Sequence, residues 1–184
     1  MMYKFAAASA QELIVFGAAR PGDRDEQVRQ WLDFMQARGI QRVCCLLAEA
    51  ELRRYGDLLS VYAQTFGVGQ VCWAPIPDFH LVSPALLRQQ ILPFLCQADQ
   101  AQAKAVVHCA GGVGRTGQVL AAWLVAGRGF SRSTAIAAVR QQGRNPYEAV
   151  LAAPFQGRNP WRVATALHRL LDDCAGWAGE AGGW

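Results

Sequence analysis

The sequence has little charge, and its positive charge comes almost entirely from arginine. Charged residues make up 17% of the 184 positions, and the only lysines are Lys4 and Lys104. The formal net charge is +4, but the chain has no lysine-rich run and no alternation of basic and aromatic residues. Nucleic acid is therefore not expected as a partner, whereas small anionic substrates are compatible with this charge.

Long apolar runs are also missing. No stretch reaches the roughly 18 residues that a membrane-spanning helix requires, so no membrane span is expected. The segment Met1–Ala10 superficially resembles a signal peptide, but its apolar part is short and the strand-like Leu13–Phe16 follows at once. We therefore expect a cytoplasmic protein.

The sequence also lacks cysteine and histidine residues at the spacing that metal sites require. The adjacent pair Cys44–Cys45 is also a poor disulfide candidate. Neither a metal ion nor a cofactor is expected, and a reducing cytoplasm suits free thiols. Five of the six cysteines lie mostly in apolar stretches and are expected to be small buried side chains: Cys44, Cys45, Cys72, Cys96 and Cys174.

The length and the 52% share of hydrophobic residues indicate one domain with a substantial core. We expect this domain to extend over residues 1–184, with its core at about residues 12–174, and the glycine-rich segment 176–184 to fray. Segments of strand and helix length alternate, which favours an α/β three-layer sandwich around a mostly parallel sheet of four to five strands. Strands are predicted over Leu13–Phe16, Arg42–Leu47, Val71–Trp73 and Ala105–His108. Helices are predicted over about Asp25–Arg38, Glu49–Phe66, Pro84–Ala98 with Ser83 as its cap, Arg115–Ala126 and Ser131–Gln142.

The ten residues His108–Gly117, called the signature loop below, carry the clearest chemical pattern. They lie between an apolar strand and an apolar helix, and three glycines let the backbone curl tightly. Such a loop directs its N–H groups and the positive end of a helix at one anion. The lysine of a nucleotide-binding Walker loop is missing. The expected phosphate-binding residues are Ala110, Gly111, Gly112, Val113, Gly114 and Arg115.

The side chains of this loop suit phosphate monoester hydrolysis, which needs strong stabilisation of negative charge. Cys109 is expected beneath the phosphorus as a thiolate, favoured by the loop amides, the helix terminus and Arg115. Arg115 can bind two phosphate oxygens at once. The imidazole of His108 is expected to hydrogen-bond the loop backbone and hold the loop's shape, and Thr116 to donate its hydroxyl to the departing sulfur. Alternatively, His108 is only a buried strand residue and Thr116 only a first-turn helix residue.

A general acid is also required for the leaving group. The candidate is Asp78 in the segment Ala74–Phe79, where two prolines fix the backbone just after a predicted strand. The same carboxyl group would activate water in the second step. The alternative is a solvated turn aspartate.

The residues His108-Cys109, five intervening residues and Arg115-Thr116 resemble the signature of the cysteine-dependent protein tyrosine phosphatase superfamily. Pro75-Ile76-Pro77-Asp78 is similar to the general-acid loop of its small dual-specificity-like members. The resemblance extends over about Leu13–Val150. It implies a phosphocysteine on Cys109, phosphate binding by Arg115, acid and base roles for Asp78, and no metal.

Departures from this family, and a comparison with its inositol-lipid members, affect the expected substrate choice. Gln118 stands where relatives more often have a small residue or threonine, and no long tyrosine-recognition loop is present. Relatives that act on inositol lipids often carry lysines where this chain has Ala110 and Val113. We therefore expect phosphotyrosine, phosphoserine or phosphothreonine substrates, with inhibition by vanadate, tungstate and sulfate. The alternatives are an inositol phosphate, phosphoinositide or nucleotide phosphatase, and a catalytically silent phosphate-binding adaptor.

Two features outside the core pattern carry further hypotheses. The segment Gln142–Tyr147 recurs as Gln156–Trp161, and we interpret the echo as helix punctuation, in which glycine ends one helix and asparagine caps the next. Alternatively, Arg144 or Arg158 contacts a second anionic group at the pocket mouth. A reversible disulfide of Cys109 with Cys72 or Cys44 is a second hypothesis, because thiolates oxidise readily.

Overall fold

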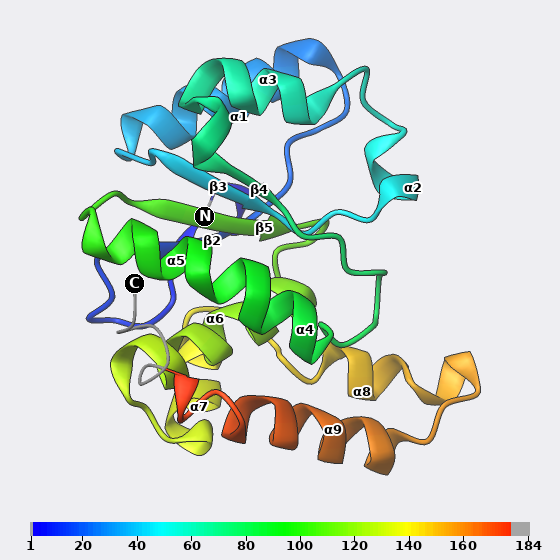
Figure 1. The fold of residues 1–184 in the computed structure, drawn as a ribbon. Helices are drawn as coiled ribbons and strands as arrows, with labels where there is room; N and C mark the ends of the chain where they lie inside the picture. Colours follow the sequence, from blue (N-terminus) through cyan, green and yellow to red (C-terminus); the bar gives the residue numbers. More distant parts are fainter. Residues whose placement is uncertain (1, 178–184) are drawn as a thin grey trace.

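The computed structural model describes residues 2–177 and has a five-stranded sheet at its centre (Figure 1). The strand order is β1-β2-β5-β3-β4, in which β1 is antiparallel to β2 and all other neighbours are parallel. The predicted mostly parallel α/β sandwich is confirmed. The strands are β1 (Ala6–Ala7), β2 (Val15–Ala19), β3 (Arg42–Cys45), β4 (Val71–Trp73) and β5 (Ala105–Cys109).

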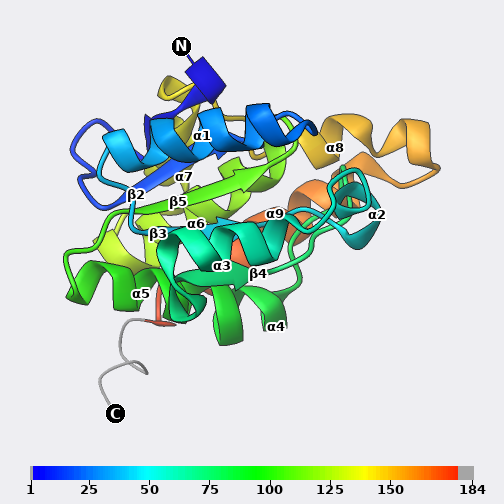
Figure 2. The same ribbon diagram turned by 90° about the horizontal axis from the view of Figure 1, so that it is seen from above.

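Helices cover both faces of this sheet (Figures 1 and 2). One face packs against α1 (Asp25–Ala37) and α3 (Leu58–Phe66), and the other against α5 (Leu92–Gln100) and α6 (Gly114–Arg128). Beyond α6 lie α7 (Arg132–Gln141) and α9 (Pro160–Asp172). The short helices are α2 (Glu49–Leu52), α4 (Pro84–Leu86) and α8 (Glu148–Ala152), and a π-helical segment Leu87–Ile91 joins α4 to α5.

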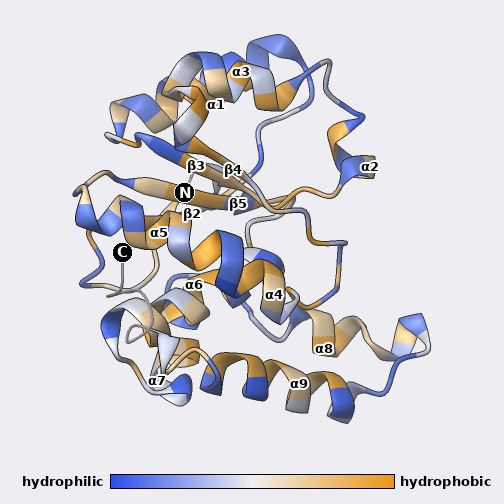
Figure 3. Cartoon of the chain, viewed as in Figure 1, coloured by the Kyte–Doolittle hydropathy of each residue, from blue (hydrophilic) through white to orange (hydrophobic). Residues whose placement is uncertain are grey.

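The hydropathy of the elements explains this layering (Figure 3). All five residues of β5, the central strand, are buried, as is expected for a parallel strand covered on both faces. Helix α1 buries one stripe at helical spacing, namely Val28, Trp31, Leu32 and Met35. The helix ends before Gly39, whose φ of 75° favours glycine.

One expected element is wrong, and one observed element was not expected. The predicted single helix Glu49–Phe66 is divided into α2 and α3, because Asp57 caps α3 by accepting the Ser60 amide at 3.1 Å. Strand β1 was not expected, since two alanines carry no strand pattern. Among residues 2–177, no helix has the length and apolar character of a membrane span. Residues 178–184 of the segment predicted to fray lie outside the described residues.

The two copies of the echo behave differently. Gly143 and Gly157 both adopt left-handed conformations, with φ of 77° and 66°. Asn159 caps α9 as predicted, because its side chain accepts the Trp161 and Arg162 amides. Asn145 does not cap α8, which begins two residues later than the echo predicts. Its side chain still accepts the Tyr147 amide at 3.3 Å, and its backbone amide donates to the Val113 carbonyl at 3.3 Å, which ties this copy to the signature loop.

Candidate active site

The signature loop connects β5 to α6 and leans against the end of β2. Gly112 has a φ of 65°, and a Cβ at this position would lie 2.4 Å from the Ala18 carbonyl oxygen. The amide of Arg20 donates to the Cys109 carbonyl at 2.9 Å. Glycine is therefore required at position 112 by conformation and by space.

Arg144 holds this loop from beneath. It is 2% exposed, and its guanidinium donates to the carbonyls of Gly112, Gly17 and Lys4. Burial lowers the pKa of Arg144 to about 10, against the opposing charge of Cys109, so the group stays cationic at neutral pH. Backbone carbonyls thus hold both terminal nitrogens of the guanidinium, and contact of Arg144 with a second anionic group stays a prediction.

Cys109 and Arg115 lie together in the buried part of the site. Each is only 2% exposed, at opposite ends of the loop. Arg115 donates to both carboxylate oxygens of Glu51, at 2.5 and 2.9 Å, and to the Ile76 carbonyl at 2.9 Å. Its Nη2 atom also lies 3.0 Å from Oδ1 of Asp78. Arg115 thus brings the two predicted motifs into one site.

Glu51, in α2, was not identified from the sequence. Burial acts to raise the pKa of Glu51, but hydrogen bonds from Arg115 and the Ala48 amide outweigh it and lower the pKa below its usual value. Burial likewise acts to lower the pKa of Arg115, and Glu51 raises it above its usual value. Each side chain therefore keeps the other ionised. An acidic residue near a predicted helix start has no distinguishing sequence signal.

His108 lies behind the loop in an aromatic setting. Its Nε2 atom is 3.2 Å from the Tyr62 hydroxyl, and the Trp31 ring packs edge-on against it at 5.3 Å. Burial lowers the pKa of His108 to about 3, so the imidazole is neutral at physiological pH. The imidazole thus contacts a tyrosine on α3 that sequence spacing did not indicate, and support of the loop's shape by His108 stays a prediction.

Thr116 occupies the first turn of α6 and is fully buried. Its hydroxyl oxygen makes no hydrogen bond to any described residue. Donation to the departing sulfur of Cys109 therefore stays a prediction.

The acid loop, defined as residues 74–82, follows β4. Asp78 has a half-exposed side chain, and its Oδ1 atom accepts the Phe79 amide at 3.1 Å. Further along the loop, the side chain of Gln118 contacts the backbone of His80 and Val82. Arg158 also reaches this loop, where it donates to a backbone carbonyl. The carboxyl group of Asp78 thus lies at the rim of the site, where a leaving group would depart.

Glu148, the first residue of α8, adds a third carboxyl group. Its side chain packs against Gly114, where an added Cβ would lie 1.9 Å from Oε2 of Glu148. Burial and then the charge of Asp78 raise the pKa of Glu148 above its usual value. The sequence echo drew attention to the preceding residues and not to this one.

Cys44 and Cys72 are opposed on β3 and β4, in the same apolar cluster as Cys109. A hydrogen bond with Cys72 raises the pKa of Cys44. A disulfide to Cys109 stays a prediction, checked by non-reducing peptide mapping after peroxide treatment. Within residues 2–177, no three His, Cys, Asp or Glu side chains are grouped as a metal site requires.

Known structures share this fold. Tk-PTP in its active form is 26% identical, with a TM-score of 0.68 over 92% of this chain and 99% of that chain. PTPMT1 in complex with PI(5)P is 15% identical, with a TM-score of 0.66 over 95% and 98%. TpbA from P. aeruginosa in complex with pTyr is 16% identical, with a TM-score of 0.52 over 84% and 85%.

A family model agrees with these structures and with the site. The model described as "Polymorphic toxin system, DSP-PTPase phosphatase" matches residues 16–128. This match extends from β2 through the acid loop and the signature loop to the end of α6. The chain therefore belongs to this family of cysteine-based dual-specificity and tyrosine phosphatases, which are hydrolases.

Proposed function

We propose that this phosphatase hydrolyses phosphate monoesters on phosphorylated proteins through a phosphocysteine at Cys109. The observation that carries the proposal is the 3.0 Å contact between Arg115 and Asp78, which joins a phosphate-binding group to a candidate acid above a cysteine loop. These are the parts that covalent phosphoryl transfer requires.

In the first step the thiolate of Cys109 attacks phosphorus. The S–P bond forms, the ester P–O bond breaks, and Asp78 gives its proton to the leaving oxygen. The loop amides of residues 110–114 and the guanidinium of Arg115 stabilise the equatorial oxygens. Glu51 keeps this guanidinium oriented through its two hydrogen bonds.

In the second step water cleaves the phosphocysteine. The Asp78 carboxylate takes a proton from water, an O–P bond forms, and the S–P bond breaks to release inorganic phosphate and the thiolate. Thr116 would donate its hydroxyl to the sulfur as it leaves.

A second candidate is an inositol phosphate or phosphoinositide substrate on the same site. The PI(5)P complex of PTPMT1 favours it, whereas the pTyr complex of TpbA favours the first candidate. Ala110 and Val113 supply no positive charge for further phosphate groups, and we therefore prefer phosphoproteins. We further propose that the enzyme acts in a reducing cytoplasm, where Cys109 stays reduced.

The first experiment measures hydrolysis of 4-nitrophenyl phosphate in EDTA by the wild type, Cys109→Ser and the matched Cys96→Ser. We expect full activity without metal, none in Cys109→Ser, and near wild-type activity in Cys96→Ser. Tungstate should still bind Cys109→Ser in calorimetry. A wild type that binds tungstate without turnover is instead an adaptor.

The second experiment compares kcat/KM for phosphotyrosine, phosphoserine and phosphothreonine peptides with that for inositol phosphates, phosphoinositide vesicles and nucleotides. We expect phosphopeptides to be preferred by about tenfold or more, which corresponds to about 1.4 kcal/mol in the transition state. A preference for any other group would replace the proposed substrate class.

A further inference from the structure

We infer that Gln118 is a positioning residue, which together with Arg158 fixes the acid loop so that Asp78 remains beside Arg115. The inference rests on the proposed function for the role of Asp78. It assigns a purpose to Gln118, the position at which the signature departs from the pattern that it otherwise resembles.

Both ends of the Gln118 amide are used. Oε1 accepts the Val82 amide at 3.0 Å, and Nε2 donates to the His80 carbonyl at 3.2 Å. Gln118 is 1% exposed and Val82 2% exposed, so water cannot readily replace these bonds. A buried donor or acceptor left without a partner costs about 1–3 kcal/mol, which makes this pair of bonds a strong constraint on the loop.

Gln118 and Arg115 are three residues apart on α6 and therefore share one face of that helix. Arg115 donates to the Ile76 carbonyl, which precedes Asp78, and Gln118 binds the backbone that follows it. The acid loop is thus held on both sides of Asp78 by the helix that also carries the phosphate-binding arginine. Acid and phosphate site therefore keep a fixed relative position.

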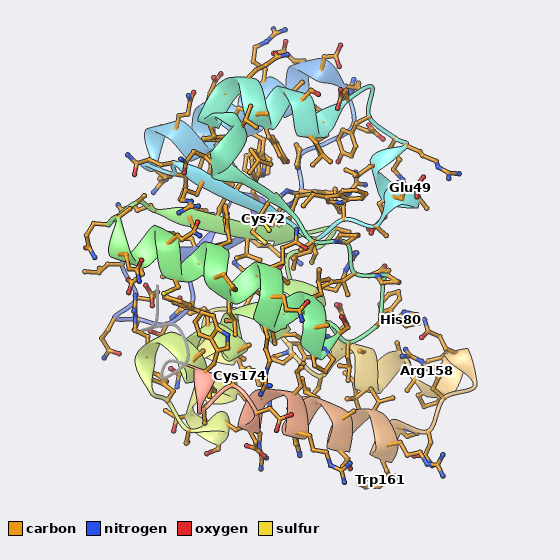
Figure 4. The ribbon with its side chains drawn as sticks, in the orientation of Figure 1. Glu49, Cys72, His80, Arg158, Trp161 and Cys174 are labelled. Atoms are coloured by element: carbon orange, nitrogen blue, oxygen red, sulfur yellow. The ribbon has the colours of Figure 1, made fainter. Side chains whose placement is uncertain are left out.

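Arg158 provides the third attachment, from the turn between α8 and α9. Its Nη2 atom donates to the Phe79 carbonyl at 2.5 Å. Phe79 has a φ of 58°, a left-handed conformation that is unfavourable for a residue other than glycine and needs support from its surroundings. Figure 4 shows Arg158 and His80 on the same side of the molecule, with Arg158 below the acid loop.

The principal test replaces Gln118 with methionine, which keeps the volume and removes both hydrogen bonds. We measure kcat/KM for phenyl phosphate, whose leaving group needs protonation to depart. We also measure it for 4-nitrophenyl phosphate, whose more acidic leaving group depends less on protonation. Gln118→Met should lower kcat/KM by about tenfold for phenyl phosphate and by about twofold for 4-nitrophenyl phosphate, because part of the rate enhancement by the general acid is lost. Vanadate affinity should be unchanged. Equal losses for both substrates would overturn the inference.

The matched control is Gln90→Met. Gln90 donates to the carbonyl of Trp73, the last residue of β4, at 2.8 Å, and among the described residues its side chain has no hydrogen bond to the acid loop that follows. The ratio of the two kcat/KM values should stay at its wild-type value. A double-mutant cycle completes the kinetics: Gln118→Met should cause no further loss in an Asp78→Asn background, and an additive loss would contradict action through Asp78.

Hydrogen exchange of the Val82 amide gives a readout that does not depend on activity. This amide should exchange at least tenfold faster in Gln118→Met, and again in Arg158→Met if that attachment contributes. If Gln118→Met does not fold, Gln118→Asn shortens the side chain and serves in its place. An inactive wild type with Gln118-dependent protection would refute the proposed function alone, whereas unchanged protection refutes the positioning role.

Discussion

Arg115 is the residue at which most constraints of the site meet. It contacts Glu51, Asp78 and the Ile76 carbonyl while being almost completely buried. A buried guanidinium of this kind needs anionic partners to remain charged without a large desolvation cost. A bound phosphate group would add a third anion beside Arg115, next to Glu51 and Asp78. Protonation of Asp78, as proposed for the general acid, would reduce this excess of negative charge.

The proposed general-acid role of Asp78 predicts that the loss of activity on its removal depends on the leaving group. Asp78→Asn should lower kcat/KM for phenyl phosphate by about 10²- to 10⁴-fold, because the asparagine cannot supply a proton. Substituted phenyl phosphates with more acidic leaving groups should lose progressively less. Normal rates with good and poor leaving groups alike would remove Asp78 from the mechanism.

His108 predicts a pH dependence of stability. Its pKa of about 3 in the folded protein lies below the ordinary value of 6.5, so the unfolded chain binds more protons between these values. The free energy of unfolding should therefore fall as pH drops through this window, by at most about 1.4 kcal/mol per pH unit from this group. His108→Asn should show a shallower decline in urea unfolding between pH 6.5 and 4. A slope equal to that of the wild type would contradict the neutral buried imidazole.

The signature loop is the element with the tightest backbone requirement. Gly112→Ala should lower the free energy of unfolding by about 1–3 kcal/mol, because the new methyl group meets the Ala18 carbonyl and the φ is left-handed. Activity should also fall, since the loop amides move. The control is Gly69→Ala, at a position with open space and an ordinary φ. Equal thermal unfolding temperatures for the two variants would refute the requirement.

Elements with a strong local pattern could be predicted from the sequence. The strands β2 to β5, helix α1 and the strand–loop–helix around Cys109 were expected at nearly their observed positions. The break between α2 and α3 was not expected, because it depends on a single aspartate that caps α3. Glu51 and Tyr62 were missed for another reason: their partners, Arg115 and His108, are far away in sequence, and only the sheet order β5-β3-β4 brings them together.

At the scale of the whole molecule, Glu12 connects the start of the chain to the helical layer. Its buried carboxylate accepts hydrogen bonds from the amides of Ile14 and Val15, from Trp123 and from Arg128. Arg128 also pairs with Asp99 of α5. Glu12 thus joins the segment before β2 to α6, and Arg128 extends this network to α5.

Glu12→Gln should therefore destabilise the entire fold. A buried polar group left without its partner costs about 1–3 kcal/mol, and we expect a loss of this size in the free energy of unfolding, because Arg128 keeps Asp99 as a charged partner. Because Glu12 is remote from Cys109, kcat/KM at low temperature should be retained. The control is Glu26→Gln, which removes an exposed pair and should cost less than about 1 kcal/mol. Comparable losses in the free energy of unfolding of both variants would contradict the proposed stabilising role of Glu12.

The recurring Gly-Arg-Asn-Pro segment has a consequence for aligning this chain with its relatives. In the first copy, Arg144 is buried under the signature loop. In the second copy, Arg158 contacts the acid loop. A sequence alignment that matches these two segments by residue identity can therefore pair the wrong copies. It would then assign the contacts of Arg144 to Arg158, or the reverse. The neighbour after proline resolves the ambiguity: Tyr147 bonds His168, whereas Trp161 projects outward.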